Sequence, residues 1–171
     1  VSATKWLSQI ELTRLDAADG YWIPRGWSKE APIKTHSRID VPRSGQTIDL
    51  SATSGAPVAV AGVAWGGYRG VQRVEVRILP ADEADELIDP TTGEDVGGAD
   101  SVGEWVEGRL SEALTQSSWR QWVVEWDATP GDYRIEVRAT DGTGETQTAR
   151  RQQPAPDGAT GYHRSWVTVR G

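Results

Sequence analysis

The sequence predicts an all-β protein, an antiparallel β-sandwich with an irregular N-terminal arm, and three observations predict it. Several segments alternate apolar and polar residues with period two, which is typical of half-buried strands. Pro and Gly residues that favour tight turns fall between these segments. No stretch of ten or more residues carries a convincing helical stripe. Short strands with frequent turns and no helices favour two packed sheets.

About seven strands are expected. They lie at residues 36–41, 46–50, 58–63, 73–78, 121–126, 133–140 and 166–169. Segment 58–63 is apolar throughout and reads as a buried strand, whereas the others alternate. Turn signals stand at Pro42, Gly66, Thr129 and Asp141. Because true immunoglobulin domains add a cysteine pair and this chain has none, the predicted class is immunoglobulin-like (Ig-like, of the E-set kind).

The chain divides into an arm at residues 1–31 and an Ig-like domain at residues 32–171. Residues 4–15 are compatible with one more strand, and residues 20–32 are rich in Trp, Pro and Gly and read as irregular. Trp6, Trp22 and Trp27 on the arm need a surface to pack against, since burying an aromatic side chain stabilises by roughly 1.5–3 kcal/mol.

An acidic insertion is expected inside the domain, at residues 79–103. Nine Asp or Glu and no Lys or Arg lie between Asp82 and Glu104, so this stretch carries the excess behind the net charge of −7. A solvated loop is the simpler interpretation, and a calcium site is the alternative, although no DxDxDG spacing is present. The nearly neutral remainder has no basic cluster, which argues against nucleic acid and against a membrane surface as partners.

Composition excludes several kinds of site. The absence of Cys rules out disulfides, thiolate metal ligands and cysteine nucleophiles, and two distant histidines, His36 and His163, make a His-based zinc site improbable. The chain starts at Val1 and contains no Met, which favours a piece of a longer polypeptide. No segment resembles a signal peptide or a membrane span, so an export signal or anchor would lie outside these residues.

No motif indicates catalysis. There is no GxSxG elbow, GxGxxG turn or P-loop, and both histidines are expected to be structural. Alternating Arg and Glu at 73–77 and 134–138 indicate either a solvated sheet face or ion pairs between strands or subunits. Most of the nine Trp are explained by core packing, and exposed Trp rings that stack on sugars are the functional alternative. Five of these residues fall in or beside strands and are expected to brace the sheets: Trp65, Trp119, Trp122, Trp126 and Trp166.

Landmarks spread along the chain carry a family resemblance. They are KWL at 5–7, GYW at 20–22, VAGVAWGGYRGVQRVEVRI at 60–78, SSWRQWVVEWDATPGDYRIEVRATDG at 117–142 and GYHRSWVTV at 161–169. In this order and spacing the chain resembles the C-terminal dimerisation domain of sulfite-oxidase-type molybdopterin-dependent oxidoreductases, of the actinobacterial kind. The match covers roughly residues 32–169, and the arm resembles the tail of the molybdenum domain.

The resemblance implies a dimerisation domain without catalysis of its own. Its partners would be a second copy and the upstream molybdenum-cofactor domain, which holds molybdenum-molybdopterin through a cysteine that has no counterpart here, so no cofactor is expected in this chain. Lys5 and Trp27 match positions at the edge of the parent cofactor site. Trp27 stands close to an active-site tyrosine of the family and lacks its phenolic hydroxyl, and Ala155 stands near the place of a substrate-binding arginine. The resemblance therefore does not extend to sulfite specificity.

One alternative of another class stays open on the sequence. A free-standing secreted module that binds carbohydrate or protein through Trp side chains, with or without calcium, also fits a β-sandwich rich in Trp.

Overall fold

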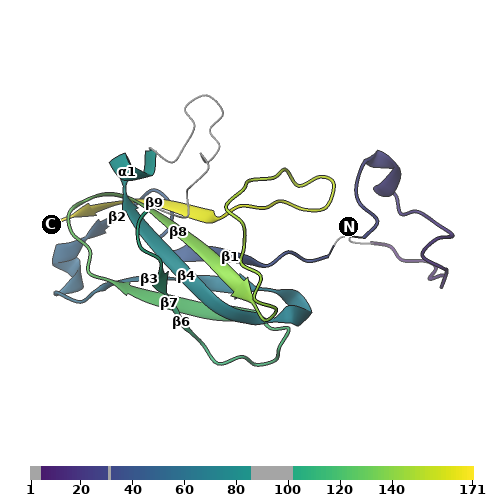
Figure 1. The fold of residues 1–171 in the computed structure, drawn as a ribbon, viewed down its shortest axis with the longest axis horizontal. Helices are drawn as coiled ribbons and strands as arrows, with labels where there is room; N and C mark the ends of the chain where they lie inside the picture. The colour runs from purple at the N-terminus through teal and green to yellow at the C-terminus, as the bar shows by residue number, and fades with distance from the viewer. Residues whose placement is uncertain (1–4, 31, 86–101) are drawn as a thin grey trace.

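A computed structural model describes residues 5–30, 32–85 and 102–171, and it confirms the β-sandwich (Figure 1). The four-stranded sheet has the order β1 (His36–Val41), β3 (Val58–Trp65), β7 (Arg120–Trp126) and β6 (Arg109–Leu110). The five-stranded sheet has the order β2 (Gln46–Asp49), β9 (His163–Arg170), β8 (Gly131–Asp141), β4 (Val71–Pro80) and β5 (Val106–Glu107). All neighbours are antiparallel except β2 and β9. This arrangement matches the two sheets of an Ig-like sandwich.

The core lies between the two sheets and is built from the inward-facing half of each alternating strand. Its fully buried members are mostly β-branched, which suits the pleated surface of a sheet. They include Val60, Val74, Val76, Trp122, Ile135 and Val137. Trp126 and Tyr133 pack against this cluster edge to face, with ring centroids 4.8 Å apart.

Local features fix the turns and the register. Gly62 lies beside a β-bulge in β1, where a Cβ atom would stand 1.9 Å from the carbonyl oxygen of Arg38, so only glycine fits. At the turn from β7 to β8, the hydroxyl of Tyr133 is 2.8 Å from the Thr129 hydroxyl and braces the corner.

Helical structure is confined to short pieces. They are α1 (Ala81–Asp85) after β4 and three 3-10 turns, Ile23–Arg25, Leu50–Thr53 and Gly67–Arg69. No helix within the described ranges is long and apolar enough to cross a membrane.

The expected strand at residues 4–15 is wrong for its described part. Residues 5–15 form no strand, and every residue from Lys5 to Trp22 is exposed. A strand needs a neighbour to receive its hydrogen bonds, and the arm leads away from the sandwich (Figure 1). The expected start of the acidic insertion also differs, because Leu79 and Pro80 still pair with β8 in β4. Most of the insertion, residues 86–101, lies outside the described residues.

Candidate functional site

The two residues matched to the parent cofactor site both lie on the arm. Lys5 is exposed, and Trp27 follows the 3-10 turn Ile23–Arg25, where Gly26 adopts a left-handed φ of 94°. Between these two described side chains the structure records no hydrogen bond or ring contact, so it does not bring them together. Trp27 stands next to a contact between the arm and the rest of the chain. The backbone N–H of Ser28 donates to Pro156 O at 2.9 Å.

The arm exposes far more apolar surface than an isolated peptide tolerates well. Trp6 is 97% exposed and Leu12 is 100% exposed, and the chain itself covers none of the described residues before Ile23. Other large apolar side chains of the arm are also solvent-exposed: Leu7, Ile10, Leu15, Tyr21, Trp22 and Trp27. Large apolar side chains exposed in such numbers are typical of interaction sites.

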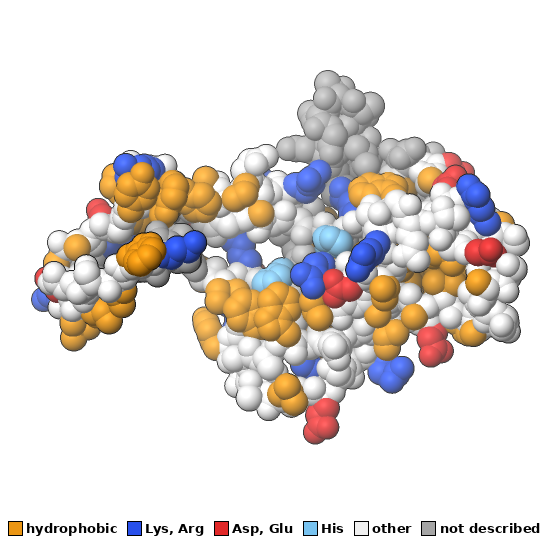
Figure 2. Space-filling view, turned by 180° about the vertical axis from the view of Figure 1, so that it is seen from behind, with side chains coloured by type: hydrophobic (Ala, Val, Ile, Leu, Met, Phe, Trp, Pro, Cys, Tyr) orange, Lys and Arg blue, Asp and Glu red, His pale blue; other side chains and the backbone are white. Residues whose placement is uncertain are grey.

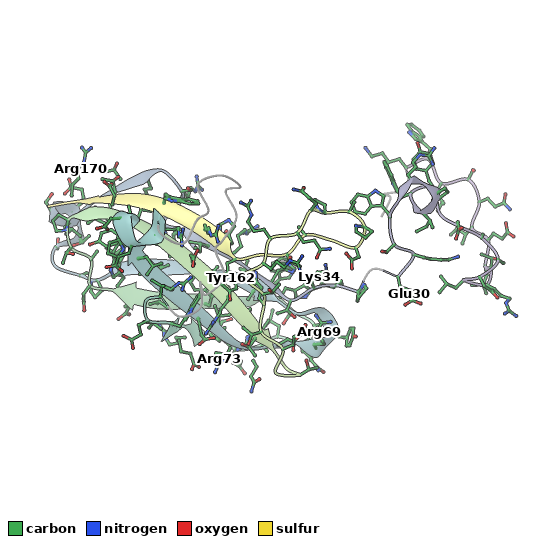
Figure 3. All side chains as sticks on the ribbon, turned by 45° about the horizontal axis from the view of Figure 1, so that its top comes forward. Glu30, Lys34, Arg69, Arg73, Tyr162 and Arg170 are labelled. Carbon is green, nitrogen blue, oxygen red and sulfur yellow. The ribbon has the colours of Figure 1, made fainter. Side chains whose placement is uncertain are left out.

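The arm meets the sandwich at a polar junction. Lys34 Nζ donates to Gly158 O at 2.9 Å and lies 3.5 Å from Asp157 Oδ1. Nearby, the fully buried Asp141 accepts from Arg69 Nε and from the Thr35 hydroxyl, both at 2.7 Å. Lys34 and Arg69 lie at the end of the sandwich that faces the arm, opposite Arg170 (Figure 3).

Asp141 stays ionised at this junction. Burial alone raises the pKa of a carboxyl group, but hydrogen bonds from Thr143, Arg69 and Thr35 outweigh it and hold the pKa of Asp141 far below its usual range. The junction also borders an open cavity of about 600 Å³, whose lining includes Ile33, His36, Tyr68 and Thr160. The charged groups of the junction form ion pairs and hydrogen bonds with one another, so its role is structural.

The outer face of the five-stranded sheet carries a buried charged layer. Glu136 is fully buried and accepts from Arg77 Nε at 3.1 Å and from Arg164 Nε at 2.8 Å, and Arg134 Nε lies 3.2 Å from it. The indole of Trp105 covers this layer, 4.6 Å from the Arg77 guanidinium carbon and 4.1 Å from that of Arg138. The expected solvated face is therefore wrong for Arg77, Arg134 and Glu136, and ion pairing within the sheet is confirmed.

The outer face of the four-stranded sheet is different, because its apolar centre is only half-buried. Exposed charged and polar side chains surround that centre: Arg38, Asp40, Arg109, Gln121 and Glu125. Ala61, Val63 and Trp65 of β3 point outward, and register places Val123 of β7 beside Ala61. A hollow of about 400 Å³ lies over Ala61, Val63 and Val123. Figure 2 shows a broad hydrophobic patch beside a histidine, where His36 packs edge-on against Trp65 and Trp119. The segment expected to be a buried strand is thus buried on one face and half-buried on the other, where Ala59 is exposed.

The Trp side chains divide between the core and the surface. Trp122 is buried and Trp126 packs on the core, as expected of bracing residues. Trp119 and Trp166 are 48% and 44% exposed, so the expectation that they brace the sheets is wrong. Trp65 stacks on Trp119 outside the sheet, with ring centroids 5.3 Å apart and an interplanar angle of 7°.

Both histidines have structural contacts. His163 Nδ1 accepts the backbone N–H of Ile39 at 3.2 Å, which ties edge strand β1 to β9. Burial, followed by the positive charge of Arg38, lowers the pKa of His163. His36 Nδ1 lies 2.9 Å from Lys34 O. Among the described residues no group of three His, Cys, Asp or Glu is placed to hold a metal ion. The expected alternative of a calcium site falls mostly on residues outside them.

Sequence reasoning missed the outward Trp65–Trp119 pair, although a signal was present. Trp65 shares the parity of Val63 and Ala61 along β3, and Trp119, the residue before β7, shares that of Val123 within β7. Since Val60 and Trp122 belong to the core, alternation alone assigns the odd-numbered residues to the outer face. The Asp141–Arg69–Thr35 tie had no such signal, because it joins residues far apart in the chain.

The sequence matches no protein-family model and none of the curated proteins. Two solved structures are similar in outline. One is the sulfane dehydrogenase SoxCD from Paracoccus pantotrophus, at 20% identity and a TM-score of 0.47, covering 79% of this chain and 30% of that chain. The other is an engineered protein at 18% identity and a TM-score of 0.43, covering 82% of this chain and 21% of that chain. The chain thus spans less than a third of each, and similarity at this level assigns no activity.

Proposed function

We propose that this chain is the assembly domain of a sulfite-oxidase-type molybdopterin oxidoreductase, which forms a homodimer and does no catalysis alone. The molybdenum-molybdopterin of the parent enzyme would be held by an upstream domain. The ordered landmarks from residue 5 to residue 169 support the family, and the β-sandwich is the fold that the family implies.

The half-buried outer face of the four-stranded sheet is the observation that carries the proposal. β3 reads VAVAGVAW, which is apolar on both faces, and strands of this composition are normally buried on both faces. Here the described part of the chain buries the inner face and leaves Ala61, Val63 and Trp65 only half-buried on the outer face. A protein partner supplies a cover for that face.

The arm supports a second contact, with the upstream domain. Its large apolar side chains between Trp6 and Trp27 are exposed except Ile23, and it is tied to the sandwich at Ser28 and Lys34. We propose that the arm lies on the molybdenum-cofactor domain, where Lys5 and Trp27 border the cofactor site. Packing there would bury the aromatic rings that the isolated chain leaves in water.

The aromatic geometry favours assembly over the carbohydrate alternative. A sugar platform needs rings that lie side by side in one plane, whereas Trp65 and Trp119 stack on each other and offer one ring face. A melting-temperature shift on adding soluble oligosaccharides would nevertheless favour the binding module.

Sedimentation velocity at micromolar concentration tests the homodimer. We expect a dimer whose share increases with concentration, because a specific interface buries roughly 1,200 Å² or more in total. A chain that stays monomeric across the whole range contradicts the proposed homodimer. Coexpression with the upstream coding region tests the arm, and a stable complex in which Trp27 loses its exposure is the expected result.

A further inference from the structure

We infer that a second copy docks on the outer face of the four-stranded sheet in an isologous dimer, with the Trp65–Trp119 pair of each copy seated in the hollow of the other. The inference rests on the proposed homodimer and names the surface and geometry that make it. It follows from a projection and a recess that lie side by side on one face.

The projection is a preorganised aromatic pair. The Trp65 and Trp119 rings are parallel to within 7°, and the Trp65 indole N–H donates to Ser117 O at 2.8 Å. His36 packs edge-on against both rings, at 5.7 and 5.3 Å between centroids. These contacts fix the rings before binding, so little side-chain entropy is lost when the outer ring is buried. Exposed, rigid aromatic side chains of this kind are the usual anchors of protein interfaces.

The recess lies next to the projection on the same face. Its lining includes the small side chains of Ala61, Val63 and Val123 and, beside them, Asp40 and Arg109, and its volume is about 400 Å³. Trp65, Val63 and Ala61 follow one another along β3 with period two, so the recess begins one pleat away from the rings. A recess with an apolar floor and room for a ring is the complement that an aromatic anchor requires.

A two-fold axis brings each projection onto the partner's recess. If the axis crosses the strands at Val63, the row of Trp65 and Trp119 faces the partner's row of Ala61 and Val123, and the reverse contact follows by symmetry. The facing β1 strands then run antiparallel about Arg38, which pairs with Val63.

The charges at the edge of the face agree with this arrangement. Arg38 Nε lies 2.7 Å from Asp40 Oδ1 within one copy, and both side chains are exposed beside the recess. Because Arg38 pairs with Val63, the two Arg38 side chains face each other across this axis, and each is neutralised by Asp40 of its own copy, so the cluster has no net charge. In addition, His36 of one copy faces Asp40 of the other. The exposed polar residues Gln121 and Glu125 and the charged Arg109 complete a polar rim around the apolar centre of this face, as in specific interfaces.

Two substitutions test the geometry, one on each side of the contact. Trp119→Ala removes the projection, and Val123→Arg fills the recess. Each has a matched control on the other sheet, Trp166→Ala at a Trp of similar exposure (44% against 48%) and Val106→Arg at an exposed valine of β5. Circular dichroism and melting curves verify that all four variants fold.

Sedimentation velocity of the full chain gives the result. We expect Trp119→Ala and Val123→Arg each to raise the dimer dissociation constant by at least about 30-fold, as for interface hot spots, and the controls to leave it unchanged. An equimolar mixture of the two interface variants should dimerise more strongly than either alone, because the mixed dimer keeps one complete contact.

The outcomes separate this inference from the proposed function. If the unmodified chain dimerises and both interface variants dimerise equally well, the homodimer stands and the docking surface is wrong. If the controls weaken the dimer instead, the interface lies on the five-stranded sheet. If the unmodified chain is monomeric throughout, the docking surface and the proposed homodimer both fail.

Discussion

The outer faces of the two sheets differ in the side chains that they bear and in how far the chain covers them. The five-stranded sheet bears long charged side chains, and the chain covers them with Trp105 and the residues around Val102 and Ala84. The four-stranded sheet bears short apolar side chains at Ala61 and Val63, and the described chain leaves them half-buried.

The contrast teaches that polarity alone does not tell which face is covered. An Arg and Glu layer is buried here because each charge has a partner within the sheet, as Glu136 has in Arg77 and Arg164. The apolar centre of the other face stays half-exposed because no described segment of the chain packs over it. The first face contributes to the stability of the domain, and the second is available for assembly.

The largest expected loss of stability comes from a substitution in the charged layer of the five-stranded sheet. Glu136→Ala removes the carboxylate that Arg77, Arg134 and Arg164 share, and it leaves three buried guanidinium groups close together. Removing one partner of a buried ion pair destabilises by about 3–5 kcal/mol. We expect a loss of this size in the free energy of unfolding measured with urea.

The exposed pair on the other face is the matched control for this change. Asp40→Ala breaks the exposed contact with Arg38, and such surface pairs contribute about 0–1 kcal/mol. Equal losses for Glu136→Ala and Asp40→Ala would contradict the contrast between the two faces.

A smaller loss of stability is expected at the polar junction around Asp141. Asp141→Ala removes the acceptor of Arg69, Thr35 and Thr143, and lost hydrogen bonds to a charged group cost about 1.5–3 kcal/mol. Because the pKa of Asp141 is lowered in the folded chain, its contribution is present above its ordinary pKa of 3.8 and is lost as the pH falls below it. Urea titrations from pH 7 to pH 3 should show that the difference between Asp141→Ala and the unmodified chain shrinks in acid. A difference that stays constant down to pH 3 would contradict this role.

Protonation of His163 should have a weaker effect. Its Nδ1 accepts from Ile39 only while the ring is neutral, and the folded pKa is lowered from 6.5 by burial and by Arg38. The stabilisation is therefore complete above pH 6.5 and declines as the pH falls below it, by about 1 kcal/mol. His163→Gln keeps an acceptor and does not titrate, so melting temperatures of this variant should depend less on pH between 7 and 5. An unchanged pH dependence in this variant would assign the titration to another group.

Period-two patterns predicted the fold because burial of one sheet face leaves a direct trace in the sequence. All seven expected strands are present, as β8 illustrates with Ile135 and Val137 inside. The two-residue strands β5 and β6 were not predicted, since so short a segment shows no period.

The candidate surfaces were less predictable, because they depend on how distant segments meet. Alternation assigned Arg77 and Glu136 to the outer face correctly, but it does not report that Trp105, remote in sequence, covers that face. The same limit applied to Trp119, whose stacking on Trp65 required the pairing of β3 with β7.

The smallest change in the free energy of unfolding is expected for a charged substitution on the outer face of the four-stranded sheet. Val123→Lys places a charge at a half-buried site beside the open recess, where the long side chain can reach water, so the free energy of unfolding of the domain should change by no more than about 0.5 kcal/mol. The measurement needs a protein concentration low enough to keep the chain monomeric, because dimerisation would add its own stabilisation. Val76→Lys, in the core of the same domain, should instead prevent folding or cost several kcal/mol. A large loss for Val123→Lys in the monomer would mean that the chain itself covers this face, and the assembly surface would then have to lie elsewhere.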